Sequence, residues 1–146
     1  MKNLSKFLSK KDYTKIKLRL TKTNHFEIKA SINGAKGVFI LDTGASSSCV
    51  GFEHESFFKL TSEESEVKAT GAGASNLNTA VSKKNLLKIG KWKKKKFDLI
   101  LFDLSHVNEG LVNHDSTPVH GIIGADVLKK GKAIIDYDNK VLFLKL

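Results

Sequence analysis

The 146-residue chain contains one cysteine and one proline, and it has no long run of apolar residues. A single cysteine cannot form a disulfide within its own chain, which excludes a disulfide-stapled fold and gives no sign of an oxidising compartment. Lysines interrupt the apolar clusters of residues 1–20. The sequence therefore offers neither the apolar core of a signal peptide nor the roughly 18 apolar residues that span a bilayer. We expect a cytoplasmic protein without a membrane partner.

Arginine is also scarce, because Arg19 is the only arginine among 25 basic residues in a chain of net charge +10. The excess charge lies in residues 1–41 and 83–97. Recognition of bases and phosphates favours arginine, whereas lysine is common on exposed strand edges and hairpin tips. Nucleic-acid binding is therefore a disfavoured alternative. We expect Lys93 to Lys96 to form an exposed hairpin turn and Trp92, within it, to cover an apolar face.

The remaining composition, 40% hydrophobic and 27% charged, is typical of one globular domain. A chain of this length can bury a sufficient core without metals or cross-links. Residues 1–12 show neither sustained alternation nor a long helical stripe, so we expect a basic N-terminal tail there. Residues 13–146 are expected to form the domain.

A period of two dominates the domain and predicts an all-β fold. Apolar residues alternate with polar ones over residues 16–20 and 26–32, and Asn33-Gly34 is typical of a tight hairpin turn before the apolar run 38–41. Further strands are expected over 86–89, 97–104, 133–137 and 141–146, and a short helix over 125–130, which would end at Gly131. Residues 105–120 are interpreted as a long polar connection.

One segment has the pattern of a catalytic site. The apolar residues 38–41 lead into Asp42, Thr43, Gly44 and Ala45. A strand that ends in a carboxylate, a hydroxyl residue and a glycine can turn tightly and hold the carboxylate off its end. By itself the tripeptide is equally typical of an ordinary turn.

The surrounding residues resemble the active-site motif of aspartic proteases, and the alanine after the glycine resembles the retroviral-protease (retropepsin-like) branch. Such proteins carry a second motif, two apolar residues and a glycine before a short helix, which Ile122, Ile123 and Gly124 match. The resemblance implies a closed six-stranded acid-protease barrel with one or two short helices and one lobe per chain. It also implies a substrate-binding flap in the glycine-rich segment between the motifs, at Gly71, Ala72, Gly73 and Ala74.

The chemistry of this family needs two carboxylates that share one proton, so that one activates water and the other protonates the scissile carbonyl. The chain contains one Asp-Thr-Gly, and Asp115-Ser116-Thr117 lacks the glycine and the apolar lead-in. Two copies about a two-fold axis would supply the pair. The resemblance therefore implies a homodimeric aspartic endopeptidase that binds an extended peptide or protein, with Asp42 catalytic, Thr43 bonded across the axis and no cofactor or metal.

Several residues depart from this pattern or suggest other chemistry. Ala125 and the serines 46–48 stand where retroviral members often place an ion pair. Cys49 with His54 is interpreted as a buried cysteine rather than a nucleophile and base, and the histidines and acid of the 105–120 segment as solvated loop residues rather than metal ligands. The main alternative function is a catalytically silent dimerisation or peptide-binding module on the same fold.

Overall fold

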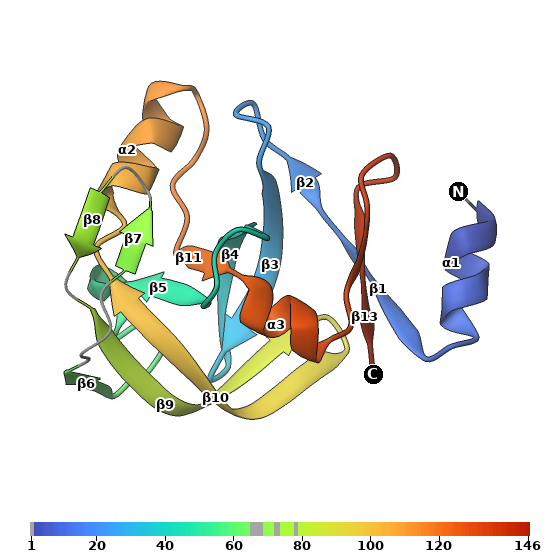
Figure 1. The fold of residues 1–146 in the computed structure, drawn as a ribbon, viewed down its shortest axis with the longest axis horizontal. Coiled ribbons are helices and arrows are strands. Elements are labelled where there is room, and N and C mark those ends of the chain that lie inside the picture. Colours follow the sequence, from blue (N-terminus) through green and yellow to red (C-terminus); the bar gives the residue numbers. More distant parts are fainter. Residues whose placement is uncertain (1, 65–68, 72–73, 78) are drawn as a thin grey trace.

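Six strands form a closed barrel, as the family resemblance implies. The computed structural model describes all residues except 1, 65–68, 72–73 and 78 (Figure 1). Hydrogen bonds connect the barrel strands in the order β3, β4, β11, β5, β10 and β9, and β3 also pairs with β9, which closes the ring. Their bounds are Phe26–Ile32 (β3), Ala35–Leu41 (β4), Cys49–Gly51 (β5), Ala80–Ile89 (β9), Trp92–Phe102 (β10) and Gly121–Ile123 (β11).

Short elements extend this ring. Strand β2 (Arg19–Leu20) pairs with β3, and β6 (Ser62–Glu64) pairs with β9. A 3-10 turn, η1 (Phe52–His54), follows β5. Strands β7 (Ala69–Gly71) and β8 (Ala74–Leu77) form a separate antiparallel hairpin.

The β3–β4 hairpin turns at Asn33-Gly34, as predicted. Both residues have a positive φ, 51° and 88°, which asparagine and glycine tolerate best. Strand β4 then separates two apolar clusters. Its residues Phe39 and Leu41 belong to the main core of the barrel, whereas Ile40 belongs to a second cluster, with Val38 packed against it. Alternation along β4 thus gives each side of the strand its own core.

The hairpin β9–β10 corrects one prediction. Its turn is Gly90-Lys91, and Lys93 to Lys96 lie within strand β10, where all four are exposed. The ladder to β9 is interrupted between Lys94 and Phe97, and Lys96 has a φ of 55°, so consecutive side chains can all face solvent. Trp92 is 5% exposed and packs in the main core.

Residues 105–120, expected as a long polar connection, contain helix α2 (Ser105–Asn113). Leu111 is buried in the second cluster with Ile40 and Ile122, and Val107 packs against it. The apolar residues 107 and 111 are four apart and so lie on one helical face. The polar composition of the segment concealed this short amphipathic helix.

The two ends of the chain meet on the side of the barrel away from α2 (Figure 1). Strand β13 (Val141–Lys145) lies between β1 (Tyr13–Lys17) and β12 (Ile134–Asp136). Helix α3 (Ala125–Lys130) precedes this hairpin and ends at Gly131, as predicted.

The N-terminal residues 1–12, expected as a tail, contain helix α1 (Lys2–Ser9) instead. Leu8 is buried against Val141 and Phe143 of β13, and Leu4, one turn earlier, also packs there. Helix α1 is stabilised by this contact with β13. Its apolar residues span only two turns, which is too short a pattern to predict a helix from the sequence. In the part of the chain that the structure describes, no helix is long and apolar enough to cross a bilayer.

Candidate active site

Asp42 follows Leu41, the last residue of β4. Its amide donates a hydrogen bond to the carbonyl of Ile123 (2.9 Å), which extends the parallel β4–β11 ladder by one residue. The Gly44 amide donates to Asp42 Oδ1 (2.8 Å), and the Ala45 amide donates to the Asp42 carbonyl (3.2 Å). The tight turn thus holds the carboxylate through its own backbone. Asp42 is half-buried, whereas Thr43 and Gly44 are exposed.

The second motif lies directly beside this loop. In β11, Ile122 pairs with Ile40 and Ile123 pairs with Leu41. A Cβ atom on Gly124 would lie 2.5 Å from the carbonyl oxygen of Ala45, and that same oxygen accepts a hydrogen bond from the Ala125 amide (2.7 Å). Only glycine allows the two segments to approach so closely.

A buried polar link joins the loop to helix α3. Ser48 is fully buried; its amide and hydroxyl donate to Asp126 (2.9 and 2.7 Å), and its Oγ accepts from the Gly124 amide (2.8 Å). Asp126 also accepts from the Val127 amide at the start of α3. Sequence reasoning missed this link, because it treated the serines 46–48 only as the absence of an ion pair.

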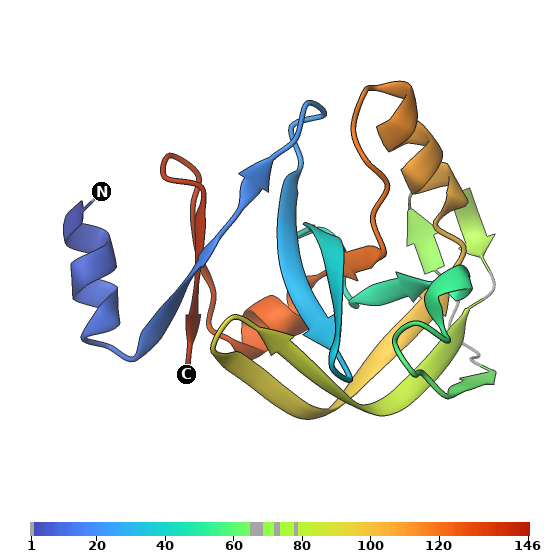
Figure 2. The same cartoon turned by 180° about the vertical axis from the view of Figure 1, so that it is seen from behind.

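The predicted flap is described in part. Gly71 ends β7 and Ala74 begins β8, and these two residues pair with each other. Ala72 and Gly73 lie outside the described residues. Both cartoon views place the hairpin beside α2 (Figures 1 and 2).

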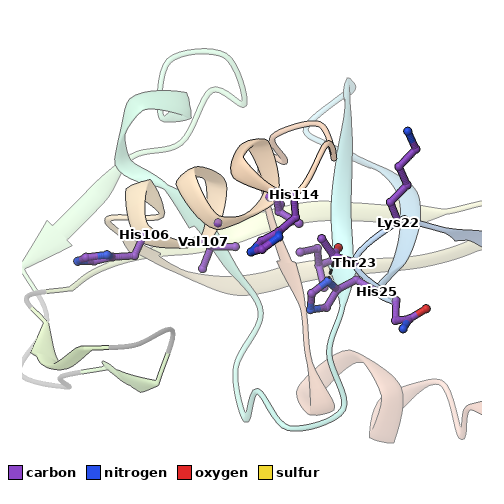
Figure 3. Close-up of a pocket in the computed structure, with 10 residues that line it drawn as sticks. Lys22, Thr23, His25, His106, Val107 and His114 are labelled. Carbon is purple, nitrogen blue, oxygen red and sulfur yellow. Dashed lines mark hydrogen bonds between the residues drawn. The ribbon is translucent and has the colours of Figure 1, made fainter.

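A cavity of about 600 Å³ opens between α2 and the turn formed by residues 21–25; we name it the α2 pocket. Figure 3 shows the rings of His25 and His114 directed into the space between these two segments, while Lys22 extends away from it. Its lining residues are Lys22, Thr23, Asn24, His25, Ile40, His106, Val107, Gly110, Leu111 and His114. No local sequence pattern indicates this pocket, because the turn and α2 that form its walls are more than 80 residues apart in the chain.

The geometry does not favour a cysteine nucleophile or a metal site. Cys49 is buried, and burial raises its pKa to about 12, so its thiol stays protonated. His54 lies against His120 instead, with 4.7 Å between ring centroids. Burial and the neighbouring His54 lower the pKa of His120. The described residues contain no group of three or more histidine, cysteine or acidic side chains placed to hold a metal ion.

Solved structures with the same fold are retropepsin-like. A retropepsin-like aspartic protease from Rickettsia conorii matches with a TM-score of 0.62 and 21% identity over 90% of this chain and 98% of its own. The EIAV protease, in complex with the inhibitor HBY-793, matches with a TM-score of 0.55 and 20% identity over 75% and 90% of the two chains. The retroviral protease-like domain of Ddi1 from Leishmania major matches with a TM-score of 0.52 and 14% identity over 81% and 86%.

These identities are low, so the structural likeness establishes the fold. A search of curated protein sequences finds no significant match. The family model described as aspartyl protease, in contrast, matches residues 28–127, which include both motifs. The chain therefore belongs to the aspartyl protease family.

Proposed function

We propose that this protein is an aspartic endopeptidase that acts as a homodimer, with Asp42 of each copy as the catalytic residue. One Asp42 carboxylate would take a proton from water while the other, protonated, donates to the oxygen of the scissile carbonyl. Two carboxylates in close contact cannot both ionise at low cost, so the pair would hold one shared proton. The observation that carries the proposal is the turn that presents a half-buried Asp42 next to exposed Thr43 and Gly44.

The surface around Asp42 supports a second copy as the source of the missing acid. Leu20 and Tyr137 are 41% and 72% exposed. Leu20 pairs with Phe26, which pairs with Leu41, and the Tyr137 ring lies 4.9 Å from that of Phe26. Two large exposed side chains thus lie near Phe26, which pairs with the residue before Asp42, and exposed apolar surface of this kind is expected of an interface. Thr43 would hydrogen-bond to its counterpart across the two-fold axis, and Gly44 and Ala45 would allow the two loops to approach closely.

The β7–β8 hairpin would act as the flap. Its backbone groups would pair with an extended peptide or protein substrate as an added strand, so that main-chain hydrogen bonds supply affinity. The motif Ile122, Ile123 and Gly124 would keep the Asp42 loop in its conformation beneath the substrate.

Cleavage of a peptide library across about pH 4 to 8, a range chosen around the shared-proton chemistry, tests the proposal. We expect the protein to cleave peptides and Asp42→Asn to abolish this cleavage. Asp115→Asn, in the Asp115-Ser116-Thr117 segment, should leave it intact. No Asp42-dependent cleavage by a folded protein would contradict the enzyme and favour a peptide-binding module.

A mixing experiment tests the shared site. Random pairing of equal amounts of wild-type and Asp42→Asn chains leaves about one quarter of the dimers with both acids. Activity at constant total protein should therefore fall to that fraction once subunits exchange. A fall to about one half, the dilution expected of independent subunits, would contradict a shared dyad.

A further inference from the structure

We propose that the α2 pocket is a specificity subsite that binds an acidic side chain of the substrate, with His25 and His114 as its specificity-determining residues. This inference rests on the proposed peptidase function and adds a substrate class to it. It follows from the position of the pocket, from the chemistry of its walls and from the way His25 is held.

The pocket opens on the same side of β4 as Asp42. Ile40 lines the pocket and precedes Asp42 by two residues, and side chains two apart on a strand share a face. Phe39 and Leu41 face the main core instead. Two residues of a strand span about 7 Å. A peptide whose scissile bond lies at Asp42 would therefore place the side chain of a residue close to that bond at the pocket.

The walls of the pocket combine an apolar base with nitrogen donors. Ile40, Val107 and Leu111 supply the apolar surface, and the two imidazoles face the space between the turn and α2 (Figure 3). Among the described residues, none that lines the pocket is acidic. Imidazole N–H groups donate to carboxylates, and a charged donor makes this hydrogen bond shorter and stronger. A carboxylate on a short aliphatic stem matches both parts of the lining.

His25 is held in place by its own turn. Thr23 Oγ1 lies 2.7 Å from His25 Nδ1 and 2.8 Å from Thr21 Oγ1, and the His25 amide donates to Thr21 Oγ1 (3.1 Å). Thr23 Oγ1 also lies 3.5 Å from Ser116 Oγ, which connects the turn to the segment after α2. Because Nδ1 is engaged, Nε2 is the nitrogen that a ligand would meet, and little side-chain freedom is lost on binding.

The acidic residues near the pocket, Glu27, Glu109 and Asp115, do not cancel its preference for an acidic side chain. Glu27 pairs with Ile40 across β3 and β4 and so shares its side of the sheet, but Arg19 binds both carboxylate oxygens of Glu27 (3.2 and 2.8 Å). Glu109 and Asp115 are exposed and do not line the pocket. Lys22, whose side chain extends away from the two rings, is a basic residue of the lining.

Cleavage-site profiling tests the inference. A diverse peptide library is digested at about pH 5.5, where histidine side chains generally carry charge, and the products are sequenced by mass spectrometry. We expect Asp and Glu to be enriched at one position within two residues of the cleaved bond. For a matched pair of peptides with Glu or Gln at that position, we expect kcat/KM to favour Glu by about tenfold.

Substitutions of the two histidines test whether the preference for Glu over Gln comes from the α2 pocket. His25→Gln and His114→Gln should each remove most of the preference for Glu over Gln, and His114→Glu should shift it towards Lys and Arg. His114 is exposed at the end of α2, so its variants are expected to fold. Lys93→Gln, which removes a charge from an exposed site on β10, should leave the preference unchanged.

The outcomes separate the two proposals. Asp42-dependent cleavage without enrichment of acids, or with an enrichment that persists in both His114 variants, would overturn the pocket assignment and leave the peptidase intact. A library that shows no Asp42-dependent cleavage would overturn both.

Discussion

The loop that carries Asp42 follows β4, and helix α2, which ends just before His114, packs against Ile40 of β4, but the two are held by different balances of contacts. Hydrogen bonds hold the loop: Ser48 binds Asp126 and the Gly124 amide, and the Ala45 carbonyl accepts from the Ala125 amide. Helix α2 packs through apolar contacts around Leu111, and Asn108 adds two hydrogen bonds with the backbone of Val119 (3.1 and 2.8 Å). Directional bonds define the position of a catalytic atom closely, whereas an apolar contact holds a helix and leaves its exposed residues free to vary. The loop and α2 thus depend on different sets of hydrogen bonds, while Ala45 of the loop packs against the same apolar cluster that holds α2.

The largest effect on cleavage activity is expected at Gly124, where the Asp42 loop leaves no space for a side chain. Gly124→Ala would place a methyl group against the Ala45 carbonyl, which is backbone and cannot rotate away. We expect about 3 kcal/mol of lost stability and loss of cleavage activity, because the Asp42 turn must shift. Urea unfolding and peptide cleavage measure both effects.

Gly110→Ala in α2 is the matched control. A Cβ at this position would meet nothing within 4 Å, and alanine is the better helix former. Stability should rise by about 0.5 to 1 kcal/mol. Equal effects of the two substitutions would contradict the contrast between the loop and the helix.

Leu111→Ala addresses the apolar support of α2. Removing this buried side chain should cost about 2 to 4 kcal/mol in urea unfolding. Because α2 forms one wall of the α2 pocket, the preference between Glu and Gln peptides should weaken more than the turnover of the Gln peptide. Val112→Ala, at a position 55% exposed, should change stability by less than about 0.5 kcal/mol. A uniform loss of turnover for both peptides would show that α2 also supports the loop.

Ser48→Ala removes the hydroxyl from the buried link. It leaves the Gly124 amide without its acceptor and Asp126 without one of its donors. We expect a loss of about 1 to 3 kcal/mol in urea unfolding, together with reduced activity. Ser47→Ala, on the exposed part of the same loop, should be nearly neutral. If both variants are neutral, hydrogen bonds through Ser48 do not hold the loop.

The smallest effect concerns His120, just before β11, whose pKa is lowered from 6.5 by burial and by His54. A lowered pKa means that the folded state favours the neutral ring, so this contribution to stability is present above about pH 6.5 and is lost as the pH falls through the folded pKa. An NMR titration should give a midpoint below 6.5, and His54→Gln should raise it. A midpoint above 6.5 would contradict the packing described here.

Much of this architecture was predictable because its signals are local. Alternation over residues 26–32, the Asn33-Gly34 turn and the helix ending at Gly131 each depend on neighbours within a few residues. The placement of the β9–β10 turn was wrong because a run of lysines resembles a turn, although an irregular ladder accommodates it in a strand. Helices α1 and α2 were missed because each is short and is stabilised by contacts with distant strands.

The amino-acid sequence by itself determined the all-β class, the position of Asp42 at the end of an apolar strand and the resemblance that the family match confirmed. Tertiary structure alone decided the closure of β3 on β9, the bond from Ser48 to Asp126 and the α2 pocket between His25 and His114. The physical reason is chain separation. Alternation and turns record the preferences of adjacent residues, whereas a contact between residues 80 apart depends on the path of all the chain between them.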